Sequence, residues 1–191
     1  MTRLDAQMAF LTESDRLKSI TRATTLCDAS RHENSAEHSW HLALYALTLS
    51  EYAPQGVSID RVIRMLLLHD LVEIDAGDAP IYAQTEESKA DMERAEQAAA
   101  DRIFGLLPDD QMAALRDLWQ EFEAAETPDA IFAKSLDRFQ PPNQNLAAGG
   151  GSWTDYNVTF DKLDARVGQP IRRGAPALWS WIVPKIRAVM G

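Results

Sequence analysis

Apolar residues recur every three or four positions along most of the chain, which is the spacing of one face of an α-helix. No segment shows the alternation of apolar and polar residues that is typical of a half-buried strand, and there is no internal repeat. The 191 residues suffice to bury a substantial core, and 46% of them are hydrophobic, as in an average globular domain. The sequence therefore predicts an all-α fold, with residues 1–191 in a single domain.

Capping residues and prolines divide this periodicity into separate helices. Asn34 or Ser35 can cap one helix and Ser58 the next, while Pro108 and Pro128 are suited to the first turns of two later helices. Residues 4–21 predict one or two short helices. Further helices are expected at about 36–53, 59–75, 86–104, 108–126, 128–140, 155–167 and 175–190. The stretch PPNQNLAAGGGS, 141–152, predicts a loop.

Charge and cysteine content exclude several classes of protein. The net charge is −10 and no run of lysine or arginine is present, so binding to bulk nucleic acid is not expected. No apolar run is long enough for a membrane span, and residues 1–15 lack the pattern of a signal peptide. The single cysteine, Cys27, cannot form an internal disulfide, which is typical of a protein from the reducing cytoplasm.

The segment LLLHDLVEIDAGD, 66–78, places acidic residues on a helix that is apolar on most of its circumference. At about 100° per residue, His69, Asp70 and Glu73 share one face of this helix. Buried acids are unfavourable without a partner, so this face points either into a polar cavity or at a cation. The alternative is that Asp70 and Glu73 reach water at the end of the helix.

The preceding predicted helix also carries a histidine on its apolar side, because His38 shares a stripe with Leu42, Tyr45 and Leu49. A single histidine there is usually a hydrogen-bonded core residue. Two neighbouring helices that each bring a histidine inward, one with an adjacent aspartate, provide the nitrogen and oxygen donors that suit a divalent transition metal. Binding by His38 and His41 alone is less favoured, because no HExxH pattern follows and the acids of 70–78 stay unexplained.

Three segments resemble the signature blocks of HD-domain phosphohydrolases: ENSAEHSWH (33–41), LLLHDLVEIDAGD (66–78) and KSLDRF (134–139). They resemble most the bacterial 5′-deoxynucleotidase branch, over roughly residues 10–140. The resemblance implies an HD-domain bundle of about seven to nine helices around one metal site, with C-terminal helices (154–190) packed on it.

The resemblance assigns four ligands to one divalent metal: His38, His69, Asp70 and Asp137. Periodicity alone would not select Asp137, because the apolar residues of its helix lie on the opposite side and predict a solvated aspartate. Glu73 and Asp78 match two further acids that the family places beside the metal, where they orient water and handle protons.

Asp75 has no counterpart in that pattern, so we expect it to be exposed. Gly77 is expected to let the chain turn so that Asp78 points back at the site. Arg22 matches an arginine of the deoxynucleotidases, and Lys18 and Arg31 are nearby candidates for binding the substrate phosphate.

The chain has four histidines, all within its first seventy residues, which favours one metal and a phosphate monoester as substrate. The implied cofactor is Co²⁺, Mn²⁺ or another transition metal, with Mg²⁺ as an alternative. A metal-bound water would then hydrolyse a nucleoside 5′-monophosphate, with deoxy forms favoured.

One residue departs from the family pattern: Ala23 follows Arg22 where characterised relatives have a tryptophan that crowds the 2′ position of the sugar. Ribonucleotides, or another phosphate ester such as a nucleoside triphosphate or a sugar phosphate, are therefore alternative substrates. A helical protein that binds metal or nucleotide without turnover is a third hypothesis. Relatives are commonly dimers, and the last predicted helix, with Trp179 and Trp181, is expected to lie in the core or at a homodimer interface.

Overall fold

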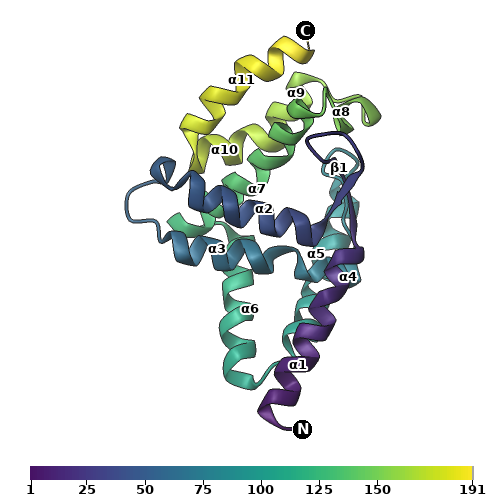
Figure 1. Cartoon of the computed structure of the whole chain (residues 1–191), viewed down its shortest axis with the longest axis vertical. Helices are drawn as coiled ribbons and strands as arrows, with labels where there is room; N and C mark the ends of the chain where they lie inside the picture. Colours follow the sequence, from purple (N-terminus) through teal and green to yellow (C-terminus); the bar gives the residue numbers. More distant parts are fainter. Residues whose placement is uncertain (191) are drawn as a thin grey trace.

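The computed structural model describes residues 1–190 and shows a helical protein with one small β-hairpin (Figure 1). Its longer helices are α1 (Arg3–Ser14), α2 (Ser35–Thr48), α3 (Ile59–Leu68), α5 (Glu86–Phe104), α6 (Asp109–Ala124), α7 (Pro128–Ala147) and α11 (Pro176–Met190). Short elements complete the chain: α4 (Glu73–Ala76), α8 (Ser152–Asp155), α9 (Phe160–Leu163), α10 (Gln169–Gly174), the 3₁₀ turns Asp15–Ser19, Ser50–Tyr52 and His69–Val72, and the π turn Asp164–Gly168. The predicted all-α fold is confirmed.

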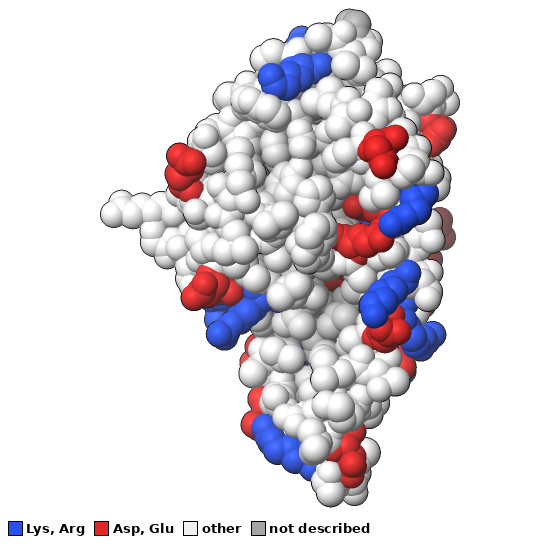
Figure 2. All heavy atoms as spheres, in the orientation of Figure 1, with Lys and Arg blue, Asp and Glu red and all other residues white. Residues whose placement is uncertain are grey.

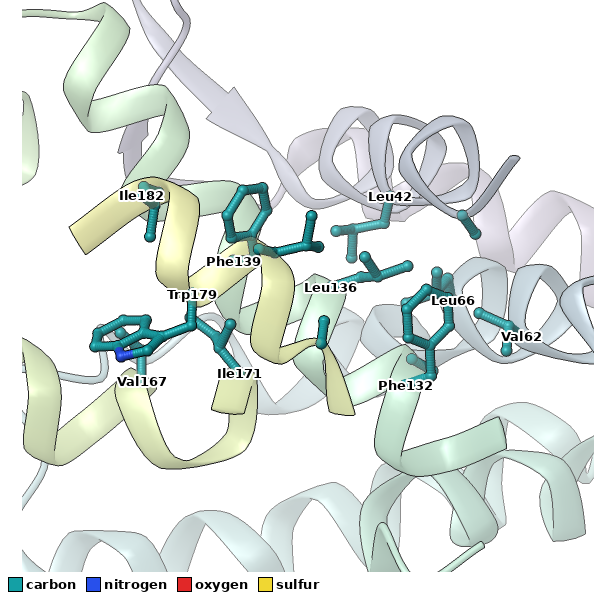
Figure 3. Packing of buried hydrophobic residues seen from close by; sticks show 14 of the residues in the cluster. Leu42, Val62, Leu66, Phe132, Leu136, Phe139, Val167, Ile171, Trp179 and Ile182 are labelled. Carbon is teal, nitrogen blue, oxygen red and sulfur yellow. The ribbon is translucent and has the colours of Figure 1, made fainter. Parts of the chain in front are cut away.

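Helix α7 passes behind α2 and α3 in the middle of the molecule (Figure 1). Its side chains Phe132, Leu136 and Phe139 pack with residues of α2 and α3 on one side and of α10 and α11 on the other (Figure 3). A second apolar cluster, which includes Phe104 and Trp119, joins α1, α5 and α6 to residues 71–74. The core therefore encloses residues 69–74, the first part of the segment in which the sequence concentrates its acids.

Some local signals at helix starts act as the sequence predicts, but Ser58 forms no side-chain cap for α3, and Pro108 lies at the N-cap of α6 rather than in its first turn. The Asn34 side chain accepts from the Glu37 backbone N–H, and the Glu37 carboxylate accepts from the Asn34 N–H in return, which fixes the start of α2. The Thr127 hydroxyl caps α7, with Pro128 in its first turn. Helix α5 has the predicted bounds, 86–104.

The two strands were not predicted from the sequence. β1 (Thr21–Thr25) and β2 (His32–Asn34) pair antiparallel with an irregular register, Thr21 opposite Asn34 and Thr25 opposite His32. Such short strands give no measurable period-two pattern, so the prediction of helix up to residue 21 and of no strand after it was wrong at this point.

The prediction that a helix ends before Pro141 was also wrong, because α7 continues through Pro141 and Pro142 to Ala147. These prolines lack the N–H groups that would bond to the carbonyls of Asp137 and Arg138, at a typical cost of about 3 kcal/mol. Buried residues on both sides of the prolines, Phe139 and Gln144 among them, hold the helix in place. Tertiary packing thus outweighs a local helix breaker.

Three further boundaries differ from the predicted ones. The helix expected at 36–53 ends at Thr48, and the helix expected at 155–167 is divided into α8, α9 and the π turn. The helix expected at 59–75 changes into a 3₁₀ turn at His69 before α4 begins. None of the helices within residues 1–190 combines the length and apolar character that a membrane span needs.

Candidate metal centre

Two histidines face each other across the α2–α3 packing, with ring centroids 5.5 Å apart. His38 on α2 is fully buried and His69, at the start of the 3₁₀ turn, is 5% exposed. The Trp119 indole N–H donates to the His69 carbonyl (3.2 Å), and the Phe122 ring packs edge-on against its imidazole. The inward position that periodicity predicts for His38 is confirmed.

The hydrogen bonds of the two imidazoles show which nitrogen is available to bind a metal. His69 Nδ1 lies 2.8 Å from the Leu66 carbonyl oxygen, and His38 Nδ1 lies 3.1 Å from Gln140 Oε1. Both Nδ1 atoms thus have neutral acceptors that can hold the ring proton, while both Nε2 atoms face carboxylate oxygens in the interior of the site. With a metal ion bound, each ring would keep its proton on Nδ1 and offer the lone pair of Nε2.

Asp137, on α7, lies close to the Nε2 atoms of both histidines. Its Oδ1 lies 3.1 Å from His38 Nε2 and 3.7 Å from His69 Nε2. One ligand atom from each of His38, His69 and Asp137 can be chosen so that all three lie within 4.8 Å of one another. Asp70 stands beside them, with Oδ1 2.9 Å from His69 Nε2.

The donor set fits a divalent cation. Within the described residues, His69 Nε2 is buried and has no hydrogen-bond partner, although a carboxylate oxygen lies 2.9 Å away. A buried imidazole nitrogen and a carboxylate at this distance require a positive charge, which a ring proton supplies in the free protein and a metal ion would supply when bound. Two imidazole nitrogens and two carboxylates are the ligands that divalent transition metals take in proteins.

The pKa values of these residues reflect the same electrostatic field. Burial lowers the pKa of the His69 imidazole, but the carboxylates of Asp70 and Asp137 more than offset this effect and raise it to about 10. Burial alone would raise the pKa values of the two carboxyl groups, yet the imidazoles and neighbouring arginines hold both below their usual range. The potential at the imidazoles is thus strongly negative and favours a cation.

Arg22 on β1 lies beside this cluster, where the hairpin presents its side chain 13% exposed. Its Nη1 donates to Asp70 Oδ2 at 2.9 Å and lies 3.5 Å from both Glu73 Oε1 and Asp78 Oδ1. Its Nε is 3.4 Å from Glu33 Oε1. Burial lowers the pKa of Arg22, but the carboxylates of Asp70, Glu73 and Asp78 more than offset this and raise it above its already high value, so the guanidinium stays charged.

Glu73 and Asp78 are the two acids that resemblance places beside the metal, and both face Arg22. Burial and the negative charge of Asp70 raise the pKa of Glu73 well above its ordinary value, and burial raises that of Asp78. The Ser35 hydroxyl donates to Glu73 Oε2. Each carboxyl group can therefore exchange a proton closer to neutral pH than an exposed one can.

The turn after α4 places Asp78 as the sequence predicts. Gly77 adopts φ +77°, a conformation that favours glycine, and Asp78 returns to the cavity beyond it. Asp75 is exposed and forms an ion pair with Arg102, which agrees with the expectation that it has no part in the site.

Asp137 is buried, 6% exposed, which contradicts the solvated position predicted from local periodicity. α7 packs against α2, α3, α6, α10 and α11, so it has no broad solvated face against which its polar residues could be sorted. Leu67 differs in the opposite sense, because it is 47% exposed although the leucine run predicts burial.

Lys18 and Arg31 do not reach the site. Both are exposed; Lys18 pairs with Asp15 and Arg31 forms two hydrogen bonds with Glu37. Neither lines the cavity in front of the His–Asp cluster, so the structure does not support them as phosphate ligands. Proximity in sequence to Arg22 is misleading here because Lys18 lies on the 3₁₀ turn before β1 and Arg31 in the loop before β2, outside the strand residues that line the cavity.

Several site residues escape prediction from the sequence. Glu33 is 1% exposed and its Oε2 accepts from the side-chain amides of Gln140 and Gln144, at 3.1 Å each. Its Oε1 lies 3.4 Å from His38 Nδ1. Strand alternation at 32–34, exposed then buried, would have identified Glu33 had the hairpin been recognised.

A cavity opens in front of the cluster and is lined by residues from most of the elements around it. Beyond the residues already described, its wall includes Ala23, the segment 79–82, Glu96, Glu123, Lys134, Arg138, Pro141, Pro142 and Tyr156. It joins three of the candidate metal ligands, His69, Asp70 and Asp137, with Arg22, Glu73 and Asp78 in one space that a small ligand can enter, while His38 lies buried behind its wall.

This architecture defines a class: helical proteins in which histidines and aspartates of neighbouring helices form a buried candidate metal centre. The chain belongs to the HD domain family, whose model matches residues 14–179. The matched range contains every candidate ligand named above.

Individual relatives agree with this assignment. A crystal structure titled predicted metal-dependent phosphohydrolase, from Magnetospirillum magnetotacticum MS-1, is 49% identical, with a TM-score of 0.91 over 98% of this chain and 95% of that one. A human protein named 5′-deoxynucleotidase is 31% identical over 133 residues, 69% of this chain and 62% of its own length. A protein of the same name from Erwinia tasmaniensis is 26% identical, over 82% of this chain and 83% of its own length.

Proposed function

We propose that this protein is a metal-dependent phosphomonoesterase that hydrolyses nucleoside 5′-monophosphates, deoxy forms favoured, to nucleoside and phosphate. The observation that carries the proposal is the buried set of His38, His69, Asp70 and Asp137, in which the Nε2 atoms of two imidazoles face carboxylate oxygens. The names of the human and Erwinia relatives support the substrate class. The match spans 62% of the length of the human relative and 66% of that of a zebrafish relative, so their activity is proposed here rather than transferred.

The four residues would hold one divalent ion, such as Co²⁺, Mn²⁺ or another transition metal, with Mg²⁺ as an alternative. When bound, such an ion supplies an activated water and an electrophile for a phosphoryl oxygen. The chain's own residues then have distinct tasks. The Arg22 guanidinium donates to phosphoryl oxygens and keeps its charge because its pKa is raised.

Glu73 and Asp78 would handle protons. Glu73 has the higher tendency to hold a proton, since burial and Asp70 both raise its pKa, and its contact with Ser35 fixes its orientation. One carboxyl group accepts the proton of the attacking water, and the other protonates the leaving 5′-oxygen of the nucleoside. Which of the two performs each step is decided by the pH profiles of the single variants.

The sugar preference depends on Ala23, which lines the cavity. A methyl group leaves more room than the tryptophan of characterised relatives, so ribonucleotides and other phosphate esters are the second class of candidate substrates. This is the observation that favours a hydrolase with wider specificity.

The test is phosphate release from a panel of deoxy- and ribonucleoside mono- and triphosphates and sugar phosphates, with Co²⁺, Mn²⁺, Mg²⁺ or EDTA. Asp70→Ala is expected to lose both metal binding and turnover, whereas Glu73→Gln is expected to bind metal and turn over slowly. Asp75→Asn is the matched control, because this acid lies in the same segment but pairs with Arg102 on the surface. Failure of metal-loaded protein to release phosphate from any substrate would contradict the proposal, and nucleotide binding without turnover would favour the binding-protein alternative.

We also propose that two copies of the chain associate through an apolar surface formed by α2 and α11. Trp40, Leu44, Leu47 and Trp181 are each between 44% and 62% exposed, and Figure 2 shows few charged groups over the middle of α2. Contiguous exposed apolar surface of this kind is typical of protein interfaces. Light scattering should give the mass of a dimer, and Leu47→Lys should give that of a monomer; a monomeric native chain refutes the interface.

The remaining proposals concern cellular context. We propose a single domain over residues 1–191, supported by the packing of α10 and α11 on α7, with Gly191 outside the described residues. A cytoplasmic location is proposed from the lone Cys27, which is exposed and unpaired. The net charge of −10 argues against bulk nucleic acid as a partner.

A further inference from the structure

Three basic side chains line the cavity in the described part of the chain: Arg22, Lys134 and Arg138. They differ in how closely carboxylates of the protein approach them. Arg22 faces four carboxylates, with Nη1–Asp70 Oδ2 at 2.9 Å the shortest contact. Lys134 Nζ lies 3.2 Å from both oxygens of Glu123 and 4.1 Å from the centre of the Phe122 ring. Carboxylates already neutralise both of these cations, although the buried Nε of Arg22 has no hydrogen-bond partner among residues 1–190.

Arg138 is different. It follows Asp137 on α7, its side chain is 32% exposed, and its closest carboxylate contact is Nε to Asp137 Oδ2 at 3.7 Å, beyond hydrogen-bond length. Over residues 1–190 its guanidinium donates no hydrogen bond to another side chain or carbonyl. Five N–H donors on a planar group are thus available at the cavity wall, next to a candidate metal ligand.

The charge of the site gives these donors a use. Five acidic side chains surround the cluster, namely Glu33, Asp70, Glu73, Asp78 and Asp137, and Arg22 is the basic group among them. Even with a divalent ion bound and Glu73 protonated, the four remaining carboxylates outnumber the three positive charges of the ion and Arg22. A phosphate monoester carries about −1.5 to −2 at neutral pH and needs further positive charge to enter.

We propose that Arg138 is a substrate-binding residue that donates hydrogen bonds to the phosphoryl oxygens of the nucleotide. The proposal rests on the proposed function, since it names a ligand of the same phosphate. Arg138 takes the place that the sequence suggested for Lys18 and Arg31, which lie outside the cavity. Its forked geometry suits two phosphoryl oxygens at once, which a lysine at this position would not match.

The test compares Arg138→Gln and Arg138→Lys with Arg173→Gln, a control on the exposed surface of α10. Arg138→Gln is expected to raise KM about 10- to 100-fold for every nucleotide, in line with loss of a charge-assisted hydrogen bond. The KM of Arg138→Lys should lie between those of the native protein and Arg138→Gln, and the KM of the control should equal that of the native protein. Circular dichroism confirms that each variant is folded.

Two binding measurements separate a substrate contact from a structural role. Calorimetry should show that Arg138→Gln binds inorganic phosphate more weakly in the presence of Mn²⁺, yet binds Mn²⁺ itself no more weakly than the native protein. Weaker Mn²⁺ binding would mean that Arg138 only positions Asp137, and would overturn the proposal. A KM change confined to one base, or no change, overturns it too.

The same experiments keep the two proposals apart. If the native protein releases no phosphate from any nucleotide, the proposed function fails, while the phosphate affinities of the native protein and Arg138→Gln still judge Arg138. If the native protein is active and Arg138→Gln binds inorganic phosphate as tightly as the native protein does, the role of Arg138 is refuted and the proposed function stands.

Discussion

Glu96 is expected to make the protein less stable as the pH rises. This α5 residue lines the cavity, and its carboxyl group forms no hydrogen bond with any other residue of the described range 1–190. Burial and the nearby carboxylate of Glu123 raise its pKa from 4.5 to about 7, although Lys134 partly offsets them. A carboxyl group with a raised pKa binds its proton more tightly in the folded chain than in the unfolded chain. Stability is therefore lost as pH rises from about 4 to about 7, and the loss is complete above that range.

The magnitude follows from the shift. At about 1.4 kcal/mol per pKa unit the full penalty is about 3 kcal/mol, and residual contact of Glu96 with water reduces it to about 1–2 kcal/mol. Replacing the carboxylate by an amide removes the charge and keeps the shape. We therefore expect Glu96→Gln to raise the free energy of unfolding by about 1–2 kcal/mol at pH 8, and by progressively less toward pH 5.

The assay is urea unfolding followed by circular dichroism at several pH values between 5 and 8. Glu87→Gln, at an exposed position of the same helix, is the matched control and should change stability little at any pH. If Glu96→Gln raises the free energy of unfolding equally at pH 5 and pH 8, or lowers it at pH 8, the buried charge of Glu96 does not destabilise the native protein.

Three other perturbations have defined outcomes. In urea titrations, Glu33→Gln should lower the free energy of unfolding by about 2–4 kcal/mol at pH 7, because a buried carboxylate that contacts Arg22 and His38 is lost. The pKa of Glu33 is lowered in the folded chain, so the stability difference between the native protein and this variant should shrink as the pH falls below about 4. Gly174→Ala should cost about 1–3 kcal/mol in the same assay, because a Cβ there would lie 2.5 Å from the Ile131 carbonyl oxygen. Mn²⁺ at about 100 times its Kd should stabilise the native chain by about 2.7 kcal/mol in thermal unfolding, and EDTA should reverse this; an equal gain in Asp137→Asn would refute the ligand assignment.

Sequence periodicity predicts those parts of the fold whose helices have a solvated face. Helix α5 matches its predicted bounds because its exposed Glu, Asp and Arg residues contrast with a buried side that includes Ala99, Ala100 and Ile103. His38 is predicted inward for the same reason, and the cap at Asn34 is a local interaction that needs no tertiary information. These features depend on residues within one or two helical turns.

The same reasoning fails where tertiary packing decides. Asp137 lies on a helix surrounded by others, so polar and apolar residues are buried together and their spacing carries no direction. Pro141 ends a helix in isolation but not within this packed one. Glu33 depends on a hairpin of three-residue and five-residue strands that is too short to detect. Resemblance to a family found Asp137, whereas Glu33 and Arg138 became visible only from the structure.

Helix α7 links the core to the site. Phe132 and Leu136 pack into the core from one part of its surface (Figure 3). Asp137 and Gln140 contact His38 from another part. Both tasks fall within three turns of one helix, so any displacement of α7 by its apolar contacts also moves the carboxylate that both imidazoles meet. The prolines beyond Gln140 are tolerated because that packing is extensive. Stability of the core and geometry of the candidate metal centre are therefore not separable properties in this chain.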